Sequence, residues 1–184
     1  MRRIAVLASA SGSGKTTFGR MLSQRLGVPF VELDALNHVG PDWNEATPEE
    51  LRAKVTPIVD TDSWVIDGAY RSKLGDLILE RADVVVWLDP PMRIWLPRLV
   101  RRTVGRVARR EELWGGNRET MRNVFLSRDS LLLFTLRTYR RRRRRYPVEL
   151  GRFNLVRLRS TVEIEQFLRS VAHVTGAPRP TPQP

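Results

Sequence analysis

The residue types best suited to chemistry lie near the N-terminus, where Gly-Lys-Thr-Thr follows a loop of small residues. The segment reads Ile4-Ala-Val-Leu-Ala-Ser-Ala-Ser-Gly-Ser-Gly-Lys-Thr-Thr17. Gly12 and Gly14 allow backbone conformations closed to residues with a Cβ, so successive N–H groups can point into one concavity. Lys15 can follow a phosphate as a mobile point charge, and the Thr16 hydroxyl can ligate Mg²⁺. This spacing predicts a nucleotide-phosphate loop of the Walker A kind.

The elements on either side of this loop fit the same interpretation. An apolar strand is expected at 3–8 and an amphipathic helix at 15–26, whose positive dipole end would face the phosphates. One position departs from the pattern, because Ser9 stands where Walker A loops have glycine. A small residue there can still turn. The expected nucleotide-binding residues are Ser11, Gly12, Ser13, Gly14, Lys15, Thr16 and Thr17.

Carboxylates follow two of the later predicted strands. Asp67 ends the run from Ser63, and Asp89 ends the apolar run from Val84. Parallel sheets place their ligands at the carboxyl ends of strands, so either side chain could serve a metal. Either could instead cap the turn that follows it.

Composition limits the class of protein. The chain has 184 residues and no cysteine, which fits one domain and excludes disulfides and thiolate metal sites. No apolar run approaches the roughly 20 residues that span a bilayer. Met1-Arg2-Arg3 leads straight into the first strand, so no signal peptide is expected. We expect a cytoplasmic domain over residues 1–175, with no membrane partner, and a disordered Pro-rich tail over 176–184.

The net charge of +12 is concentrated in one region. Residues 93–145 hold 17 Arg against 4 acidic residues, or +13, and the rest holds 15 basic and 16 acidic residues, or −1. Such a region could face nucleotide phosphates, nucleic acid or an anionic surface. The six consecutive arginines at 140–145 surround a helix, so they cannot all face one site. They are either a solvated helix end or a polyphosphate or nucleic-acid contact.

Strand and helix patterns alternate along the chain, which predicts a parallel α/β sheet with helices on both faces. The expected strands are 3–8, 29–34, 63–67, 84–89 and 153–159. The expected helices are 15–26, 48–59, 92–108, 118–145 and 161–173, with a short helix within 70–81 and a loop at 35–46.

Two segments beyond the phosphate loop carry a family resemblance. Val65-Ile-Asp-Gly-Ala-Tyr-Arg71 resembles the adenylate-kinase segment in which a strand ends in Asp-Gly, and Arg102-Thr-Val-Gly-Arg106 resembles the opening of the adenylate-kinase lid. The chain therefore resembles the small P-loop kinases of the adenylate kinase and shikimate kinase type. That resemblance implies a five-stranded sheet of order 2-3-1-4-5 and an Arg-rich helical lid at about 101–145.

The resemblance is closest to a subgroup known as DNA topology modulation proteins, or adenylate-kinase-like ATPases. Three segments carry it: Leu33-Asp-Ala-Leu36, Trp64-Val-Ile-Asp-Gly68 and Glu112-Leu-Trp-Gly-Gly-Asn-Arg-Glu119.

The resemblance also implies roles for individual residues. Asp67 would serve the metal together with Thr16, and Asp89 stays open as the alternative. Asp34 would meet the acceptor hydroxyl, and Arg71 would bind an anionic group on the acceptor. Lys15 and the lid arginines would stabilise the transferring phosphoryl group. The lid arginines expected to do so are Arg102, Arg106 and Arg118.

These residues lead to two hypotheses of function. The first is an ATP- and Mg²⁺-dependent phosphotransferase whose partners are ATP and a small acceptor, such as a nucleotide or nucleoside. The alternative is a nucleic-acid-associated regulatory ATPase that uses the Arg-rich segment.

Overall fold

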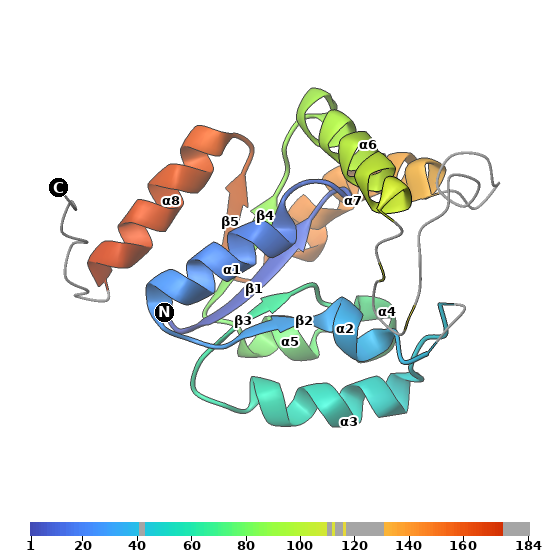
Figure 1. Cartoon of the computed structure of the whole chain (residues 1–184). Coiled ribbons are helices and arrows are strands. Elements are labelled where there is room, and N and C mark those ends of the chain that lie inside the picture. Colours follow the sequence, from blue (N-terminus) through green and yellow to red (C-terminus); the bar gives the residue numbers. More distant parts are fainter. Residues whose placement is uncertain (41–42, 110–111, 113–115, 117–130, 175–184) are drawn as a thin grey trace, which may run out of the picture.

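The computed structural model shows a five-stranded sheet flanked by helices (Figure 1), and it describes residues 1–40, 43–109, 112, 116 and 131–174. The strands are β1 (Arg3–Ala8), β2 (Phe30–Glu32), β3 (Trp64–Asp67), β4 (Val84–Leu88) and β5 (Leu155–Leu158). The helices are α1 (Lys15–Leu26), α2 (Leu33–Asn37), α3 (Pro48–Val59), α4 (Arg71–Leu74), α5 (Leu77–Arg81), α6 (Met92–Ala108), α7 (Leu131–Glu149) and α8 (Thr161–Val174).

The sheet has the order β2-β3-β1-β4-β5 and every pairing is parallel, which confirms the expected fold class. The central strand β1 pairs with β3 at Ile4–Val65 and with β4 at Ile4–Val84. All residues of β3 and β4 are buried, as expected for inner parallel strands covered on both faces. The carboxyl ends of β1, β3 and β4 therefore lie side by side at one edge.

Helices cover both faces of the sheet. On one face, Phe18 and Leu22 of α1 and Leu168 of α8 pack against the apolar residues of β1 and β4. On the other face, Leu51 of α3 and Ile78 of α5 belong to a second apolar cluster. The two clusters together make a three-layer domain with β1 and β4 at its centre.

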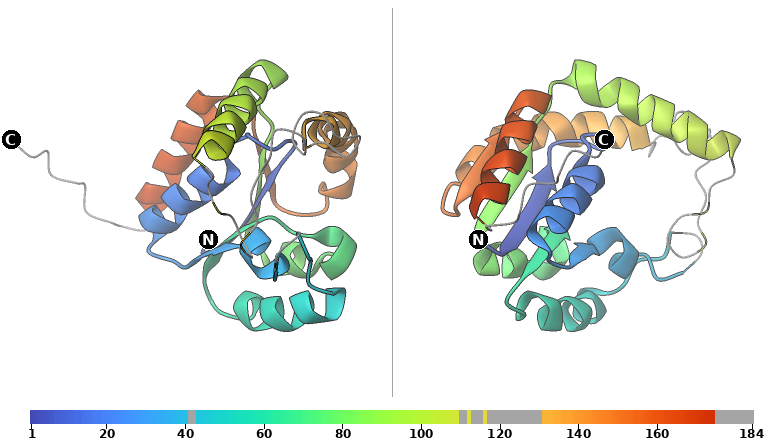
Figure 2. Two further views of the ribbon diagram at one scale, coloured as in Figure 1. Left: turned by 45° about the vertical axis from the view of Figure 1, so that its right-hand side comes forward. Right: turned by 60° about the vertical axis from the view of Figure 1, so that its left-hand side comes forward.

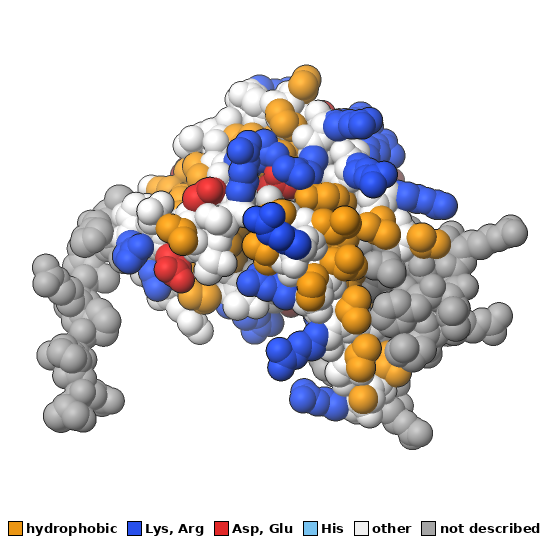
Figure 3. All heavy atoms as spheres, turned by 90° about the horizontal axis from the view of Figure 1, so that it is seen from above, with side chains coloured by type: hydrophobic (Ala, Val, Ile, Leu, Met, Phe, Trp, Pro, Cys, Tyr) orange, Lys and Arg blue, Asp and Glu red, His pale blue; other side chains and the backbone are white. Residues whose placement is uncertain are grey.

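Helices α6 and α7 lie together beyond the carboxyl ends of the strands (Figure 2). Trp95 and Leu99 of α6 pack with Tyr139 of α7 and with Ala10 of the phosphate loop. Basic side chains gather on the surface that these helices present, seen from above in Figure 3. The pair thus holds the Arg-rich part of the chain next to the loop that the sequence marks for phosphate.

Three expectations about local structure need correction. The expected strand at 29–34 and the loop after it are instead a three-residue strand and the helix α2, which begins at Leu33. The second strand ends at Glu32, which pairs with Asp67, the last residue of its only neighbour β3. Helix α7 continues through Pro147 to Glu149 rather than ending at residue 145. Residues 118–130 and the tail at 176–184 lie outside the described residues.

In the described ranges, no helix combines the length and the apolar character needed to cross a bilayer.

Candidate active site

The phosphate loop connects β1 to α1 in an open turn. Gly12 and Gly14 have φ of 80° and 86°, in the left-handed region that favours glycine. A Cβ on Gly12 would lie 2.7 Å from the backbone oxygen of Trp95, so α6 packs directly on the loop. No side chain caps the first turn of α1, which begins at Lys15. Its first N–H groups are therefore available to an anion.

Ser9 occupies the position where Walker A loops have glycine, and its side chain has two hydrogen bonds. Ser9 is fully buried and has no positive φ, so glycine is not required there. Its Oγ donates to Asp89 Oδ1 at 2.7 Å and accepts from Trp87 Nε1 at 2.8 Å. The serine thus ties the start of the loop to β4 and to the residue after it.

Asp67, at the end of β3, faces the first turn of α1. The Thr16 hydroxyl donates to Asp67 Oδ2 at 2.7 Å, and Lys15 Nζ forms an ion pair with the same carboxylate. Glu32 lies on the other side of Thr16, with Oε1 at 3.3 Å from the hydroxyl. Burial and the neighbouring Asp67 raise the pKa of Glu32 above its ordinary value.

Glu32 is a site residue that the sequence analysis missed. It ends β2 in register with Asp67, which ends β3. Adjacent parallel strands place their carboxyl ends together, so this pairing could have been inferred from the strand order that the family resemblance implied. Two carboxylates and a hydroxyl at the edge of a phosphate loop are the donors that Mg²⁺ takes beside nucleotide phosphates. Within the described part of the chain, no three acidic or histidine side chains form a preformed metal site, so phosphate oxygens and water would complete the ligand set.

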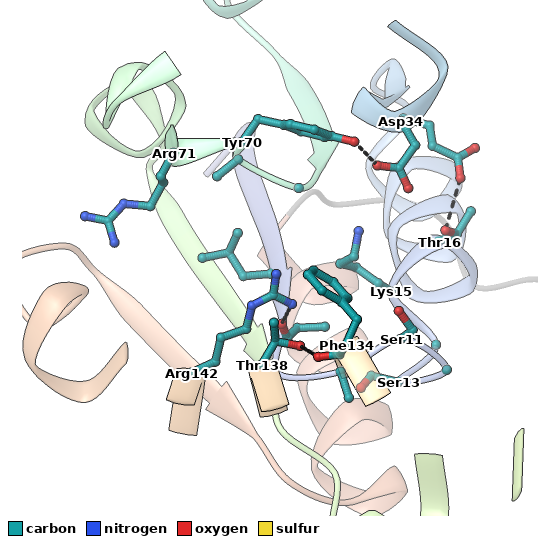
Figure 4. Close-up of a pocket in the computed structure, with 18 of the residues that line it drawn as sticks. Ser11, Ser13, Lys15, Thr16, Asp34, Tyr70, Arg71, Phe134, Thr138 and Arg142 are labelled. Carbon is teal, nitrogen blue, oxygen red and sulfur yellow. Dashed lines mark hydrogen bonds between the residues drawn. The ribbon is translucent and has the colours of Figure 1, made fainter. Parts of the chain in front are cut away.

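Asp34 lies across the cavity from the loop, in the first turn of α2. Tyr70 donates its phenolic hydrogen to Asp34 Oδ1 at 2.7 Å (Figure 4). Burial and the nearby Asp34 raise the pKa of Tyr70, so the phenol stays protonated and remains a donor. The φ of Tyr70 is 43°, a left-handed conformation that is costly for a residue with a large side chain. The hydrogen bond from Tyr70 orients the carboxylate of Asp34.

Arg71 lines the same cavity but is already paired. Its Nε donates to Asp76 Oδ1 at 2.6 Å and its Nη1 to Glu149 Oε2 at 2.7 Å. In Figure 4 the guanidinium points away from Lys15. The hydrogen bond to Asp76 raises the pKa of Arg71 above its ordinary value, as expected for a cation held by carboxylates.

Neighbouring arginines in the 140–145 run of α7 contact different parts of the molecule. Arg142 lines the cavity and donates from Nη1 to the backbone oxygen of Ala8 at 3.2 Å (Figure 4). Arg143 donates instead to Asp89 Oδ2 at 3.1 Å, next to Arg157 of β5, which binds the same oxygen through Nε at 3.0 Å. Consecutive helical residues point about 100° apart, so one run serves two sites.

Asp89, the alternative metal residue, is fully buried and accepts hydrogen bonds from Ser9, Arg143 and Arg157. Ser9 donates to Oδ1 of Asp89, and the two arginines donate to Oδ2. The geometry therefore brings Asp67, and not Asp89, to the hydroxyl expected to meet the metal.

One cavity of about 2030 Å³ is lined by residues 11–17 of the loop and α1, and by Glu32, Asp34, Tyr70, Arg71 and Arg142. Single ligand pockets are usually roughly 300–1,000 Å³, so this cavity has room for a nucleotide and an acceptor together. Of the expected lid residues, Arg102 and Arg106 of α6 line it, and Arg118 lies outside the described residues. Trp43 also lines the cavity.

The fold and the loop together define the class: the chain has the fold of the P-loop kinases of the shikimate and adenylate kinase type. The family model for shikimate kinase matches residues 11–40, which carry the loop, α1 and β2. The shikimate kinase of Gloeobacter violaceus is 32% identical over 109 residues, which is 50% of this chain and 59% of that protein. The matched stretch therefore spans less than two thirds of such curated relatives.

Solved structures share the fold over nearly the whole chain. The shikimate kinase from Bacteroides thetaiotaomicron aligns with a TM-score of 0.58 at 16% identity, covering 94% of this chain and 97% of that one. A gluconokinase from Sinorhizobium meliloti 1021 aligns with a TM-score of 0.52 at 20% identity, covering 94% and 90%. At these identities the likeness supports the fold.

Proposed function

We propose that the protein is an ATP-dependent small-molecule kinase that transfers the terminal phosphoryl group of ATP to a hydroxyl of a small acceptor. The observation that supports it best is the placement of Asp34 in the same cavity as Lys15 and Thr16. In a kinase, a carboxylate beside the phosphate loop can accept the proton of the acceptor hydroxyl, and Asp34 is the side chain placed to do so. The names of the relatives matched in sequence agree with this class.

The phosphate loop binds the β- and γ-phosphates through its backbone N–H groups and the first turn of α1. Lys15 stabilises the charge on the transferring group. Thr16, Asp67 and Glu32 are the residues that would hold Mg²⁺. When bound, the ion neutralises charge on the phosphate oxygens.

Asp34 accepts the proton of the acceptor hydroxyl as its oxygen attacks the γ-phosphorus. A new phosphorus–oxygen bond forms at the acceptor, the bond between the γ-phosphorus and the bridging oxygen breaks, and ADP leaves. Tyr70 keeps one oxygen of Asp34 occupied, so the other faces the acceptor. We propose that Arg142, Arg102 and Arg106 contact the phosphates, and that residues 101–145, including Arg118, close over them as a lid within a single domain at 1–175.

Two finer points belong to the same proposal. The resemblance to the DNA topology modulation subgroup rests on the segments at 33–36, 64–68 and 112–119, which do not identify a substrate. A cytoplasmic location fits the use of ATP and the absence of cysteine from the sequence.

The test is ADP formation from Mg·ATP by the full chain, with hydroxyl compounds added one at a time and the products identified by mass. Lys15→Ala is the control for the phosphate site, and Lys54→Ala is a matched control on an exposed face of α3. A phosphorylated product that disappears only in Lys15→Ala supports the proposal. Stimulation by DNA or RNA alone, with free phosphate as the product, would refute it in favour of a nucleic-acid-associated ATPase.

A further inference from the structure

The end of the cavity that faces Asp34 differs in charge from the end at the phosphate loop. The rest of the described lining holds seven cations and two carboxylates: Lys15, Arg20, Arg98, Arg102, Arg106, Arg141 and Arg142, with Glu32 and Glu112. Around Asp34, the described lining residues include four carboxylates and three cations: Asp34, Glu45, Asp76 and Glu149, with Arg71, Lys73 and Arg145. The acceptor end therefore has no positive excess among these residues.

Lys73 has no hydrogen left for a ligand. Its ammonium lies 2.7 Å from each of three acceptors: Glu45 Oε2, Asn37 Oδ1 and the backbone oxygen of Ala46. A lysine ammonium has three hydrogens, and this arrangement uses them all. The hydrogen bond from Lys73 also lowers the pKa of Glu45, which keeps that carboxylate ionised.

Arg71 and Arg145 are also paired with carboxylates, and each keeps N–H groups that these pairs do not use. Arg71 lies between Asp76 and Glu149, at 2.6 and 2.7 Å, and Arg145 Nε lies 2.5 Å from Glu149 Oε1. The hydrogen bond from Arg71 lowers the pKa of Asp76, so this pair stays charged on both sides at neutral pH. The positive charge of Arg71 is therefore already matched by two carboxylates, so an anionic acceptor that approached it would also approach Asp76 and Glu149.

We propose that the acceptor is an uncharged polyhydroxyl compound, a sugar or a nucleoside, rather than a carboxylic acid or a phosphate ester. This inference rests on the proposed function. The acceptor end offers hydroxyl recognition by Asp34, and its carboxylates already balance its cations, so a negative group bound there would add to the negative charge of that end. Trp43, 36% exposed on the cavity lining, offers an apolar face for a sugar or base ring.

The test uses matched pairs of acceptors that differ in the charge of one carboxyl group: methyl shikimate and shikimate, and methyl glucuronate and glucuronate. For each compound, kcat/KM is measured from ADP formation with saturating Mg·ATP, and the phosphorylated product is identified by mass. We expect an uncharged member to be phosphorylated with kcat/KM at least about tenfold above that of its anionic partner.

A variant pair separates charge from shape. Asp76→Asn combined with Glu149→Gln leaves Arg71 without its two carboxylates, so the preference should move toward the anionic member by about tenfold. Glu80→Gln is the matched control, because Glu80 belongs to the same ion cluster through Arg152 but does not line the cavity.

Each outcome decides the inference. Wild-type preference for an anionic member would overturn it and leave the kinase function standing, and so would an unchanged preference in the double variant. If no member of any pair is phosphorylated, this inference is overturned and the kinase function stands. If ATP hydrolysis is instead stimulated by DNA or RNA alone, with free phosphate as the product, the proposed function fails and this inference fails with it.

Discussion

Replacing Arg157 by Met should destabilise the protein strongly, because Arg157 neutralises the fully buried Asp89. The carboxylate of Asp89 has no solvent exposure and accepts from Ser9, Arg143 and Arg157. Arg157 also lies over the Trp87 ring, with its guanidinium carbon 4.1 Å from the ring centre. Met keeps much of the apolar stem and removes the charge.

The magnitude follows from what the substitution removes. Arg157 donates to Asp89 from both Nε and Nη2, and charged hydrogen bonds contribute about 1.5–3 kcal/mol each. Because Arg157 is 24% exposed and Arg143 remains, the loss should fall near the lower end for a broken buried pair, about 3 kcal/mol. For a domain of this size that corresponds to a decrease in Tm on the order of 10 °C.

The assay is urea unfolding followed by tryptophan fluorescence. Arg159→Met, two residues along and exposed, is the matched control and should change the free energy of unfolding by less than about 0.5 kcal/mol. Adding Asp89→Asn to Arg157→Met removes the stranded charge, so the double variant should be less destabilised than the sum of the two single variants. Strict additivity, or a loss below about 0.5 kcal/mol for Arg157→Met, would refute the reasoning.

The remaining predictions concern the active site. Asp34→Asn should lower kcat by roughly 10²–10⁴ and leave the KM for ATP nearly unchanged, and steady-state kinetics showing an unaffected kcat would remove Asp34 from its role as base. The pKa of Glu32 is raised above its ordinary value of 4.5, so protons still compete with Mg²⁺ for this carboxylate at pH values above 4.5. Mg²⁺-dependent nucleotide affinity should therefore rise as pH rises. Glu32→Gln should flatten that rise in nucleotide titrations from about pH 5 to about pH 8, and an identical slope would contradict the assignment. Gly12→Ala should weaken nucleotide binding in calorimetry and cost about 1–3 kcal/mol of stability, since its Cβ would meet the Trp95 backbone. Gly27 has a similar positive φ but open space around its Cβ position, so the control variant Gly27→Ala should bind nucleotide normally.

The large elements could be predicted from sequence because their patterns are long and regular. The helix at 15–26 and the helix at 92–108 begin and end where expected. Helix α2 was missed because five residues are too few to show a helical period, and it carries Asp34. The observed sheet order agrees with the order that the family resemblance implied.

The arginine run shows why some of the site was beyond sequence reasoning. A row of identical residues has no alternation of apolar and polar positions that would mark the buried face of the helix. The sequence therefore does not show which arginine faces which neighbour. Only the packing of α7 against the loop and β4 assigns Arg142 to the cavity and Arg143 to Asp89. Likewise, Asp67 and Asp89 follow similar strands, and their different partners appear only in three dimensions.

The ion pair between Lys15 and Asp67 has a consequence for what the site selects. Each charge neutralises the other in the structure. Neither residue can therefore bind a ligand without leaving its partner's charge unpaired, unless the ligand pairs with that partner as well. A free phosphate compensates only Lys15, and a free divalent cation compensates only Asp67. A metal–nucleotide complex carries both a cation and phosphate charges, so it can pair with Asp67 and Lys15 at the same time. The ion pair therefore favours binding of this complex over binding of either component alone.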